Sequence, residues 1–448
     1  MKRMMAIKSR ICEIMGWLAL DDTDSLNGGC TTYTFDQILR DLNQLSASGQ
    51  PWSFSTDERL VRLWPFAARR TRGNASVAAK IIVSDDGEDL FLKTLENLFE
   101  KYVEKPSRVP PISQHSNRAQ YPSSPVLIWF REKPDEEKYW EAVSSEVDLN
   151  GVIRCLENDK NVVFWNHGEL YGAIGARAAA AWKGSNSCTW ELTAYRAKKK
   201  FGSPRIVPSN IVDDMDSKFK NTFLNRDPTN GKTFIAPRSN CPILYGIRSL
   251  DSMTAESAHL WMQSKTSIEK SSHYRVWRTN QATDDHLNGV WRGYVLSKPK
   301  VQQKGHASIR VLGHFIPDSL LSETSEILGQ KITLVAFSQG GCVNSMLRDM
   351  HVGDEIEWKG LISPKGDIHA EKIRIVNPVL RNKRRPMCEC GKRMKTMGKD
   401  QGLRCPLCKK ILPNSWIGEK YVPPKNSFEG WVQPKIDSRR HLASPLEE

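Results

Sequence analysis

The sequence predicts a multi-domain protein of the α+β class, and three observations support this. The chain has 448 residues, which at roughly 150 residues per domain suggests about three domains. Strand-like and helix-like patterns alternate up to about residue 278, whereas strand patterns dominate from Val290 onwards. Four cysteines then crowd together between Cys388 and Cys408. We expect an α/β N-terminal half, an all-β segment and a small cysteine-rich module.

Composition and charge indicate a folded, basic protein. The chain has 65 Lys and Arg against 51 Asp and Glu, a formal net charge of +14, and 39% of its residues are hydrophobic. No window approaches the ~18 consecutive apolar residues that a membrane helix needs, and the N-terminal residues do not resemble a secretory signal. The six scattered cysteines indicate a reducing compartment. We therefore expect a cytoplasmic protein with an acidic partner, nucleic acid being the first candidate.

The first domain is expected at residues 16–148, after an extension formed by residues 1–15. An apolar run at 16–20 predicts a strand, and three acids follow it directly: Asp21, Asp22 and Asp24. Periodicity further predicts helices at 34–45 and 88–103, strands at 60–64, 77–83 and 126–130, and a loop or linker at 105–124.

These acids are the candidate catalytic centre. Three carboxylates within four positions repel one another unless a proton or a hard cation compensates their charge, and Mg²⁺ binds carboxylates together with substrate phosphates. Gly28 and Gly29 let backbone N–H groups approach an anion, and the hydroxyls of Thr31 and Thr32 offer contacts to a phosphate or a metal. This order suits phosphoryl transfer. An acidic turn that caps the next helix is the alternative interpretation.

A second basic element follows at residues 69–75. It contains Arg70, Thr71, Arg72 and Asn74, and its arginines are suited to clamping phosphates. As an isolated motif it is equally compatible with a basic surface turn.

A second α/β domain is expected at residues 149–278, with strands at 162–165 and 189–196 and a Gly/Ala-rich helix at 171–182. The all-β segment at 288–378 has five strand candidates, and a short helix candidate at 344–350 lies between the third and the fourth. The five strands are predicted at 290–296, 307–315, 332–337, 355–361 and 368–376. This order favours an OB-fold β-barrel, with SH3-like barrels and β-meanders as alternatives.

The cysteine cluster predicts a structural zinc site in a module at residues 384–414. Cys388 and Cys390 are separated by 14 residues from Cys405 and Cys408, and two close pairs of thiolates suit tetrahedral Zn²⁺. The first pair is Cys-x-Cys, which gives a tighter bite than Cys-x-x-Cys. Four free thiols in a basic loop are the alternative.

Positive charge surrounds this module and continues into an aromatic, basic tail at residues 415–448. Such charge density suggests contact with a phosphate backbone, against the alternative of an ordinary solvated surface. The candidate RNA-binding side chains are Arg384, Arg385, Lys392, Arg393, Lys395, Arg439 and Arg440.

Taken together and in this order, the motifs resemble the archaeal TiaS family of agmatinylcytidine synthetases. The resemblance rests on LALDDTDSLNGGCTTY at the N-terminus, RTRGNAS, WELTAYR, PILYGIRSLD, RTNQATDDHL, GLISPKGDIHAEKIRIVNP, the CGKRMK…GLRC ribbon and the final SRRHLASPL. It covers nearly the whole chain from Gly16.

The resemblance implies an activity and a domain order. Such enzymes use ATP, which ends as AMP and phosphate, to attach agmatine to the wobble cytidine of the isoleucine tRNA with a CAU anticodon. The C2 oxygen is phosphorylated, and the primary amine of agmatine displaces the phosphate. The domains would be a kinase-like domain, a ferredoxin-like domain, an OB-fold and a zinc ribbon.

The resemblance also implies roles for individual residues. Asp21, Asp22 and Asp24 match the acids for Mg²⁺ and ATP, and Thr31 matches the threonine that becomes phosphorylated. The implied ATP contacts are Arg70, Thr71, Arg72 and Asn74, to which the glycine turn and the hydroxyl add Gly28, Gly29 and Thr32. Agmatine carries a guanidinium, which calls for a carboxylate. The first candidate is Asp284, and the others are Asp285, Asp213, Asp214 and Asp216.

Two other functions compete with this interpretation. A non-catalytic single-strand binding protein would explain the barrel, the zinc module and the tail, but not the acids before Thr31. A small-molecule kinase would leave residues 290–448 without a purpose. We expect a monomer without membrane contact that binds tRNA and agmatine and uses ATP, Mg²⁺ and structural Zn²⁺.

Overall fold

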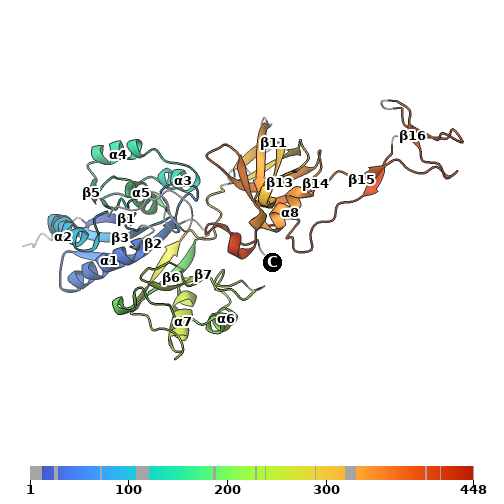
Figure 1. Ribbon diagram of the computed structural model, residues 1–448. Helices are drawn as coiled ribbons and strands as arrows, with labels where there is room; N and C mark the ends of the chain where they lie inside the picture. The colour runs from blue at the N-terminus through green and yellow to red at the C-terminus, as the bar shows by residue number, and fades with distance from the viewer. Residues whose placement is uncertain are drawn as a thin grey trace, which may run out of the picture. The chain divides into compact units, whose positions relative to one another are not determined.

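The computed structural model describes residues 13–24, 29–70, 73–106, 121–184, 188–227, 230–237, 239–287, 289–317, 329–398, 401–413 and 415–446 (Figure 1). The chain divides into two compact units. The N-terminal unit comprises residues 1–286 and 440–444, and the C-terminal unit comprises residues 287–439 and 445–448. A short segment near the end of the chain therefore belongs to the first unit.

The N-terminal unit is built on one eight-stranded sheet with the strand order β5-β4-β1-β3-β2-β8-β6-β7. The strands are β1 (Glu13–Asp21), β2 (Trp52–Arg62), β3 (Ala75–Ser84), β4 (Val126–Phe130), β5 (Val162–Asn166), β6 (Thr189–Tyr195), β7 (Ile243–Ser249) and β8 (His273–Thr279). Strands β2 and β8 pair in parallel through Arg59 with Arg278 and Leu60 with Thr279, and the other neighbours are antiparallel. The parallel pair joins the two halves of the sheet.

Helices cover both faces of this sheet, which explains why β1 is apolar throughout. Leu18 and Leu20 pack in one hydrophobic cluster, whereas Trp17 and Ala19 pack in another. The first cluster lies under α1 (Thr31–Ala47) and α2 (Glu88–Tyr102), and the second under α3 (Glu137–Ser144), α4 (Leu149–Asn158) and α5 (Gly172–Ala181). A further cluster packs α6 (Ser209–Lys218) and α7 (Ser252–Gln263) against β6, β7 and β8.

The C-terminal unit contains a sheet that closes on itself, because β11 pairs with both β12 and β9. Its elements are β9 (Gly289–Val295), β10 (Lys300–Val301), β11 (Ala307–Pro317), β12 (Gln330–Ala336), α8 (Cys342–Arg348), β13 (Glu355–Ile362) and β14 (Ile368–Asn377). Strands β12 and β14 pair in parallel. The five predicted strands and the helix between the third and the fourth are thus confirmed.

The cysteine-rich module has two small sheets. Strands β15 (Arg381–Arg384) and β19 (Ile417–Glu419) form one pair, and β16 (Lys395–Thr396), β17 (Leu403–Arg404) and β18 (Ile411–Leu412) form the other sheet. Beyond the module the chain returns to the barrel, where Val432 exchanges two backbone hydrogen bonds with Ile373 and packs in the barrel core. The tail therefore contacts the barrel.

Two sequence-based expectations for local structure differ from the structure. Strand β1 begins at Glu13, which pairs with Ser84, so residues 13–15 belong to the strand rather than to an extension. Strand β2 extends from Trp52 to Arg62, so the expected strand at 60–64 is its last part and the turn that follows. Within the part of the chain that the structure describes, no helix combines the length and the apolar character needed to cross a membrane.

Candidate active site

Three acids lie where β1 ends and the chain turns toward α1. Asp21 is the last residue of β1, and its carboxylate accepts a hydrogen bond from the backbone N–H of Asp22 at 2.7 Å. Asp22 has a φ of +58°, an uncommon conformation for a residue with a side chain, and its carboxylate accepts the N–H of Ser124 at 3.0 Å. These contacts fix the direction of both carboxylates.

Burial and mutual repulsion make Asp21 and Asp22 resist ionisation. Burial raises the pKa of Asp21 well above its ordinary value, and the charges of Asp22 and Asp24 raise it further. Burial and the charge of Asp24 raise the pKa of Asp22 to about 8, against the opposing effect of Arg69. A site of this kind accepts either protons or a cation.

The first turn of α5 packs tightly against Asp21. A Cβ atom at Gly175 would lie 1.8 Å from Oδ2 of Asp21, and one at Gly172 would lie 2.8 Å from its backbone oxygen. Any larger residue at position 175 would have to displace the carboxylate. The sequence predicts this Gly/Ala-rich helix but not its contact with Asp21, because Gly175 and Asp21 lie far apart in the sequence.

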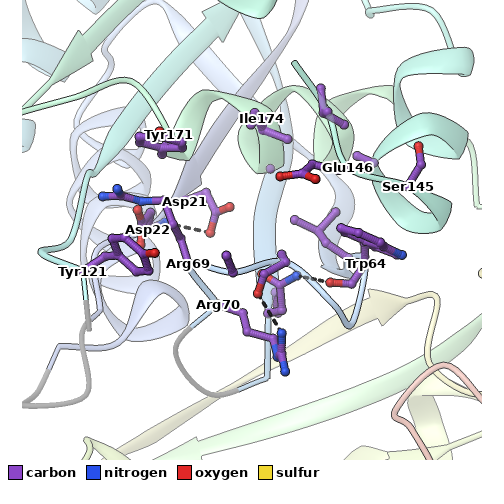
Figure 2. A pocket seen from close by; sticks show the side chains of 18 of the residues that line it. Asp21, Asp22, Trp64, Arg69, Arg70, Tyr121, Ser145, Glu146, Tyr171 and Ile174 are labelled. Atoms are coloured by element: carbon purple, nitrogen blue, oxygen red, sulfur yellow. Dashed lines mark hydrogen bonds between the residues drawn. The ribbon is translucent and has the colours of Figure 1, made fainter. Parts of the chain in front are cut away.

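A cavity of about 270 Å³ opens beside the acids (Figure 2). Asp21, Asp22 and Asp24 line it, together with Arg70 and Asn74 from the basic segment. We call it the acidic pocket. Asn74 has a φ of +43°, and its side-chain amide donates to the backbone oxygen of Trp64, so it also holds the turn.

Arg69 and two tyrosines form one wall of the acidic pocket. The Arg69 guanidinium lies 3.8 Å from the ring centre of Tyr171 and 4.7 Å from that of Tyr121 (Figure 2). This stacking holds a positive charge beside Asp22. The sequence pointed to the basic segment but not to its tyrosine partners, since they lie some 50 and 100 positions further along.

Thr31 opens α1 directly beside Asp24. Its hydroxyl donates to Oδ1 of Asp24 at 3.3 Å and lies 3.3 Å from the hydroxyl of Thr23. Gly29, at a φ of +79°, makes the turn possible, because a Cβ atom there would lie 2.4 Å from the backbone oxygen of Thr23. The hydroxyl of Thr32 contacts the sulfur of Cys30 at 3.3 Å. Gly28 lies outside the described residues.

A second cavity, of about 230 Å³, shares part of its lining with the acidic pocket. Asp24, Asn74 and Ala75 line both cavities, whereas Thr31, Thr32 and Glu191 line only this one. We call it the acceptor pocket. Glu191 accepts hydrogen bonds from Arg62 at 3.2 Å and from Gln281, so its charge is already balanced.

The remaining predicted site residues have varied positions. Thr71 and Arg72 lie outside the described residues. Asp284 lines neither pocket, and its carboxylate accepts the backbone N–H of Ser444 at 2.8 Å. Asp213 pairs with Arg226 at 2.7 Å, and Asp216 accepts the hydroxyl of Thr222 at 2.9 Å.

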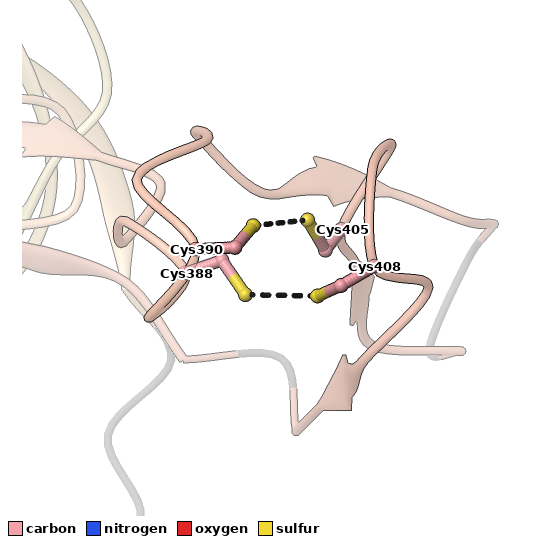
Figure 3. A group of neighbouring side chains, drawn as sticks. All are labelled: Cys388, Cys390, Cys405 and Cys408. Atoms are coloured by element: carbon pink, nitrogen blue, oxygen red, sulfur yellow. Dashed lines mark hydrogen bonds between the residues drawn. The ribbon is translucent and has the colours of Figure 1, made fainter.

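The four cysteines of the module come together (Figure 3). The sulfur atoms of Cys388 and Cys408 are 3.4 Å apart, and those of Cys390 and Cys405 are 3.3 Å apart. Among the described residues they are the one group of three or more potential ligands whose donor atoms lie within 4.8 Å of one another. The Cys-x-Cys spacing is therefore compatible with a four-sulfur site, which suits Zn²⁺.

The predicted RNA-binding cations occupy different parts of the fold. Four of them are exposed on the module: Arg384, Lys392, Arg393 and Lys395. Arg393 also donates to the backbone oxygen of Arg385 at 2.9 Å. Arg439 donates to the oxygen of Pro434 at 2.9 Å, whereas the Arg440 guanidinium lies 4.6 Å from the ring centre of Phe66 in the N-terminal unit.

The fold and these sites define a class: a multi-domain α+β protein with a pocket lined by three acids, a threonine hydroxyl hydrogen-bonded to one of them, and a group of four cysteines suited to a metal ion. Three domain models of one family match the chain, namely the TiaS TCKD domain at residues 17–167, the TiaS FLD domain at 171–286 and the TiaS C-terminal zinc ribbon domain at 385–417. Together they account for well over half of the residues. The chain belongs to the TiaS family.

Individual relatives match along their whole length. The curated isoleucine-tRNA 2-agmatinylcytidine synthetase TiaS of Methanopyrus kandleri is 29% identical over 462 residues, with 96% of each chain covered. That of Methanocaldococcus jannaschii is 28% identical and covers 97% of this chain and 99% of its own. A solved complex of TiaS with an isoleucine tRNA and ATP shares the fold, with a TM-score of 0.72 at 24% identity, covering 96% of this chain and 97% of that chain.

Proposed function

We propose that the protein is an ATP-dependent ligase that joins agmatine to C2 of the wobble cytidine in the isoleucine tRNA with a CAU anticodon. The observation that carries this proposal is the position of Asp24, whose carboxylate accepts the Thr31 hydroxyl and lines both pockets. Membership of the TiaS family supports it, and the relatives' names describe this reaction.

In this proposal ATP occupies the acidic pocket, and its phosphates approach Arg70 and Asn74. The contact at 3.3 Å lets Asp24 accept the proton of Thr31 as the Thr31 oxygen attacks the γ-phosphorus of ATP. Thr31 becomes phosphorylated, the bond from the γ-phosphorus to the bridging oxygen breaks, and ADP is the leaving group. The other proposed ATP contacts are Gly28, Gly29, Thr71 and Arg72. Thr32 stays a proposed contact although it lines the acceptor pocket.

Asp21 and Asp22 fit a hard cation, because they are neighbouring, partly buried carboxylates with raised pKa values. Asp21 and Asp22 would hold Mg²⁺, which when bound neutralises the charge of the ATP phosphates. The three acids do not form a closed ligand group by themselves, so phosphate oxygens would supply further ligands. This is how Mg²⁺ commonly binds at nucleotide sites.

The acceptor pocket would then receive the cytidine, which must leave the base stack to reach it. Transfer of a phosphoryl group from the remaining ADP to the C2 oxygen of the cytidine leaves AMP, and it turns a poor leaving group into a good one. The primary amine of agmatine forms a bond to C2, the C2–O bond breaks and phosphate leaves. Asp284 stays the proposed contact for the guanidinium of agmatine, because a carboxylate accepts strong hydrogen bonds from a guanidinium.

The rest of the chain would bind the tRNA. We propose a kinase-like domain at 16–148 and a ferredoxin-like domain at 149–278. The closed five-stranded sheet at 288–378, with its parallel β12–β14 pair, would be an OB-fold. The module at 384–414 holds Zn²⁺, and the cations around it, with Arg439 and Arg440, would contact tRNA phosphates.

Phosphorylation of Thr31 tests the catalytic part of this proposal. We expect purified protein to incorporate phosphate from γ-labelled ATP only with Mg²⁺, at Thr31 by peptide mass spectrometry. Thr31→Ala should abolish the incorporation and Thr31→Ser should retain it. Tight binding of tRNA by a protein that never becomes labelled would instead favour the non-catalytic nucleic-acid-binding function.

A further inference from the structure

The end of the chain is built into the N-terminal unit. Residues 440–444, which we call the C-terminal strap, belong to this unit, although the residues on both sides of them belong to the other. The backbone N–H of Ala282 donates to the oxygen of His441 at 3.0 Å, and that of Asp284 donates to the oxygen of Leu442 at 2.9 Å. The loop between β8 and β9 thus holds the strap in a fixed register.

Side chains of the strap reinforce this attachment. Leu442 is only 2% exposed and packs in the hydrophobic cluster beneath α5. The guanidinium of Arg440 lies 4.6 Å from the ring centre of Phe66. Because the strap contributes a core residue, its position follows from packing and not only from surface contacts.

This register places His441 in the wall of the acceptor pocket, with Asp24, Thr31 and Glu191. His441 is exposed. Within the described residues we find no hydrogen bond made by either of its ring nitrogens. Both are therefore available to a bound molecule.

The surroundings of His441 select for a neutral or electron-rich ligand. Although His441 is exposed by its surface area, partial desolvation by the protein packed around it lowers the pKa of the imidazole well below the usual value, and the charges of Arg62 and Arg248 lower it further. A neutral imidazole offers one N–H donor and one acceptor. The two guanidinium groups disfavour a cation such as agmatine in this corner, whereas the oxygen and ring nitrogen of a pyrimidine suit it.

We propose that His441 is a substrate-binding residue of the acceptor pocket, and that its imidazole N–H donates a hydrogen bond to an acceptor atom on the edge of the target cytosine. This inference rests on the proposed function, because that function puts the cytosine in this pocket. In this inference the C-terminal strap contacts the substrate directly, although the catalytic acids lie near the other end of the sequence.

The test is the single-turnover rate of agmatidine formation by full-length protein at saturating ATP, agmatine and tRNA. His441→Ala should lower this rate about tenfold, the size expected for the loss of one hydrogen bond. His441→Gln, which keeps an N–H donor, should recover part of it. The KM for agmatine should not change in either variant, since the base and not the amine is contacted.

Matched variants separate binding from folding. His441→Phe keeps a ring but removes both nitrogens, and it provides the same test should the alanine variant unfold. Leu442→Ala weakens the strap's packing but keeps the imidazole. The melting temperature of this variant should therefore fall, while its single-turnover rate at saturating substrates should stay close to that of the wild type. A wild-type rate for both His441→Ala and His441→Phe would overturn the inference, and so would a raised KM for agmatine at an unchanged saturating rate. If the wild-type protein itself forms no agmatidine, the proposed function fails instead.

Discussion

At the scale of single residues, the acids at the end of β1 set the chemistry. Asp21 and Asp22 are buried next to each other, so ionising both without a compensating charge is unfavourable. Arg69 supplies part of this charge from its place between two tyrosines. Mg²⁺ and nucleotide would supply the rest. Without these ligands, ionisation of both carboxyl groups destabilises the folded state.

This electrostatic destabilisation makes the stability of the folded protein depend on pH. The pKa of Asp22 is about 8 in the folded protein and about 3.9 in an unfolded chain. Between these values the folded state binds a proton that the unfolded state has lost, so stability falls as pH rises from about 4 to about 8. The slope for one such proton is about 1.4 kcal/mol per pH unit.

Denaturant unfolding in Mg²⁺-free buffer at several pH values measures this effect. Asp22→Asn should flatten the pH dependence in this window, and Mg²⁺ with a non-hydrolysable ATP analogue should offset it in the wild type. An unchanged slope in Asp22→Asn would show that this carboxyl does not carry the raised pKa.

At the scale of elements, the approach of α5 to β1 positions the acidic pocket. Gly175→Ala places a methyl group where Oδ2 of Asp21 now lies, at 1.8 Å, so the carboxylate must turn away. We expect the rate of Thr31 phosphorylation to fall at least tenfold, while most of the stability is kept.

Gly151→Ala in α4 is the matched control for this prediction. A Cβ atom at Gly151 would lie 3.1 Å from the mobile end of Asp148, and alanine is favoured over glycine inside a helix by roughly 0.5–1 kcal/mol. This control should keep its activity. Equal phosphorylation rates in the two variants would contradict the positioning role of Gly175.

The elements also show what local sequence reveals and what it does not. The helix after Thr31, the strand before Asp21 and the five strands after Val290 follow from periodicity within a few residues, and the structure contains them. The parallel β2–β8 pair joins residues more than 200 positions apart, and the partners of Arg69 lie some 50 and 100 positions away from it. Such contacts arise from packing, which single-residue patterns do not encode. The family resemblance gave the site roles and included the segment around His441, but it assigned no role to His441, and neither it nor the patterns indicated Gly175.

At the scale of the whole molecule, the cysteine module is a separate source of stability. Its hydrophobic cluster is very small and includes Cys388, Met394, Leu403 and Cys405, so a bound metal must provide much of the folding energy. The module carries several of the cations proposed to bind tRNA. Loss of the metal should therefore weaken tRNA binding.

Cys405→Ser tests this link. Elemental analysis should find about one zinc ion per wild-type chain and far less in the variant, whose tRNA affinity should fall and become less dependent on salt. Cys155→Ser, at an exposed cysteine of α4, should change neither quantity. Full zinc content in Cys405→Ser would argue against the four-sulfur site.

The proposed reaction forms one covalent bond, between the amine of agmatine and C2 of the wobble cytidine, and mass spectrometry detects this bond directly. Purified protein is incubated with Mg²⁺, ATP, agmatine and an unmodified isoleucine tRNA transcript with a CAU anticodon, and the digested anticodon fragment is weighed. We expect the fragment to gain a mass equal to agmatine minus water. The gain should be confined to the wobble cytidine and absent when the Asp22→Ala variant is used. An unmodified cytidine, despite tight tRNA binding and labelled Thr31, would contradict the proposed reaction.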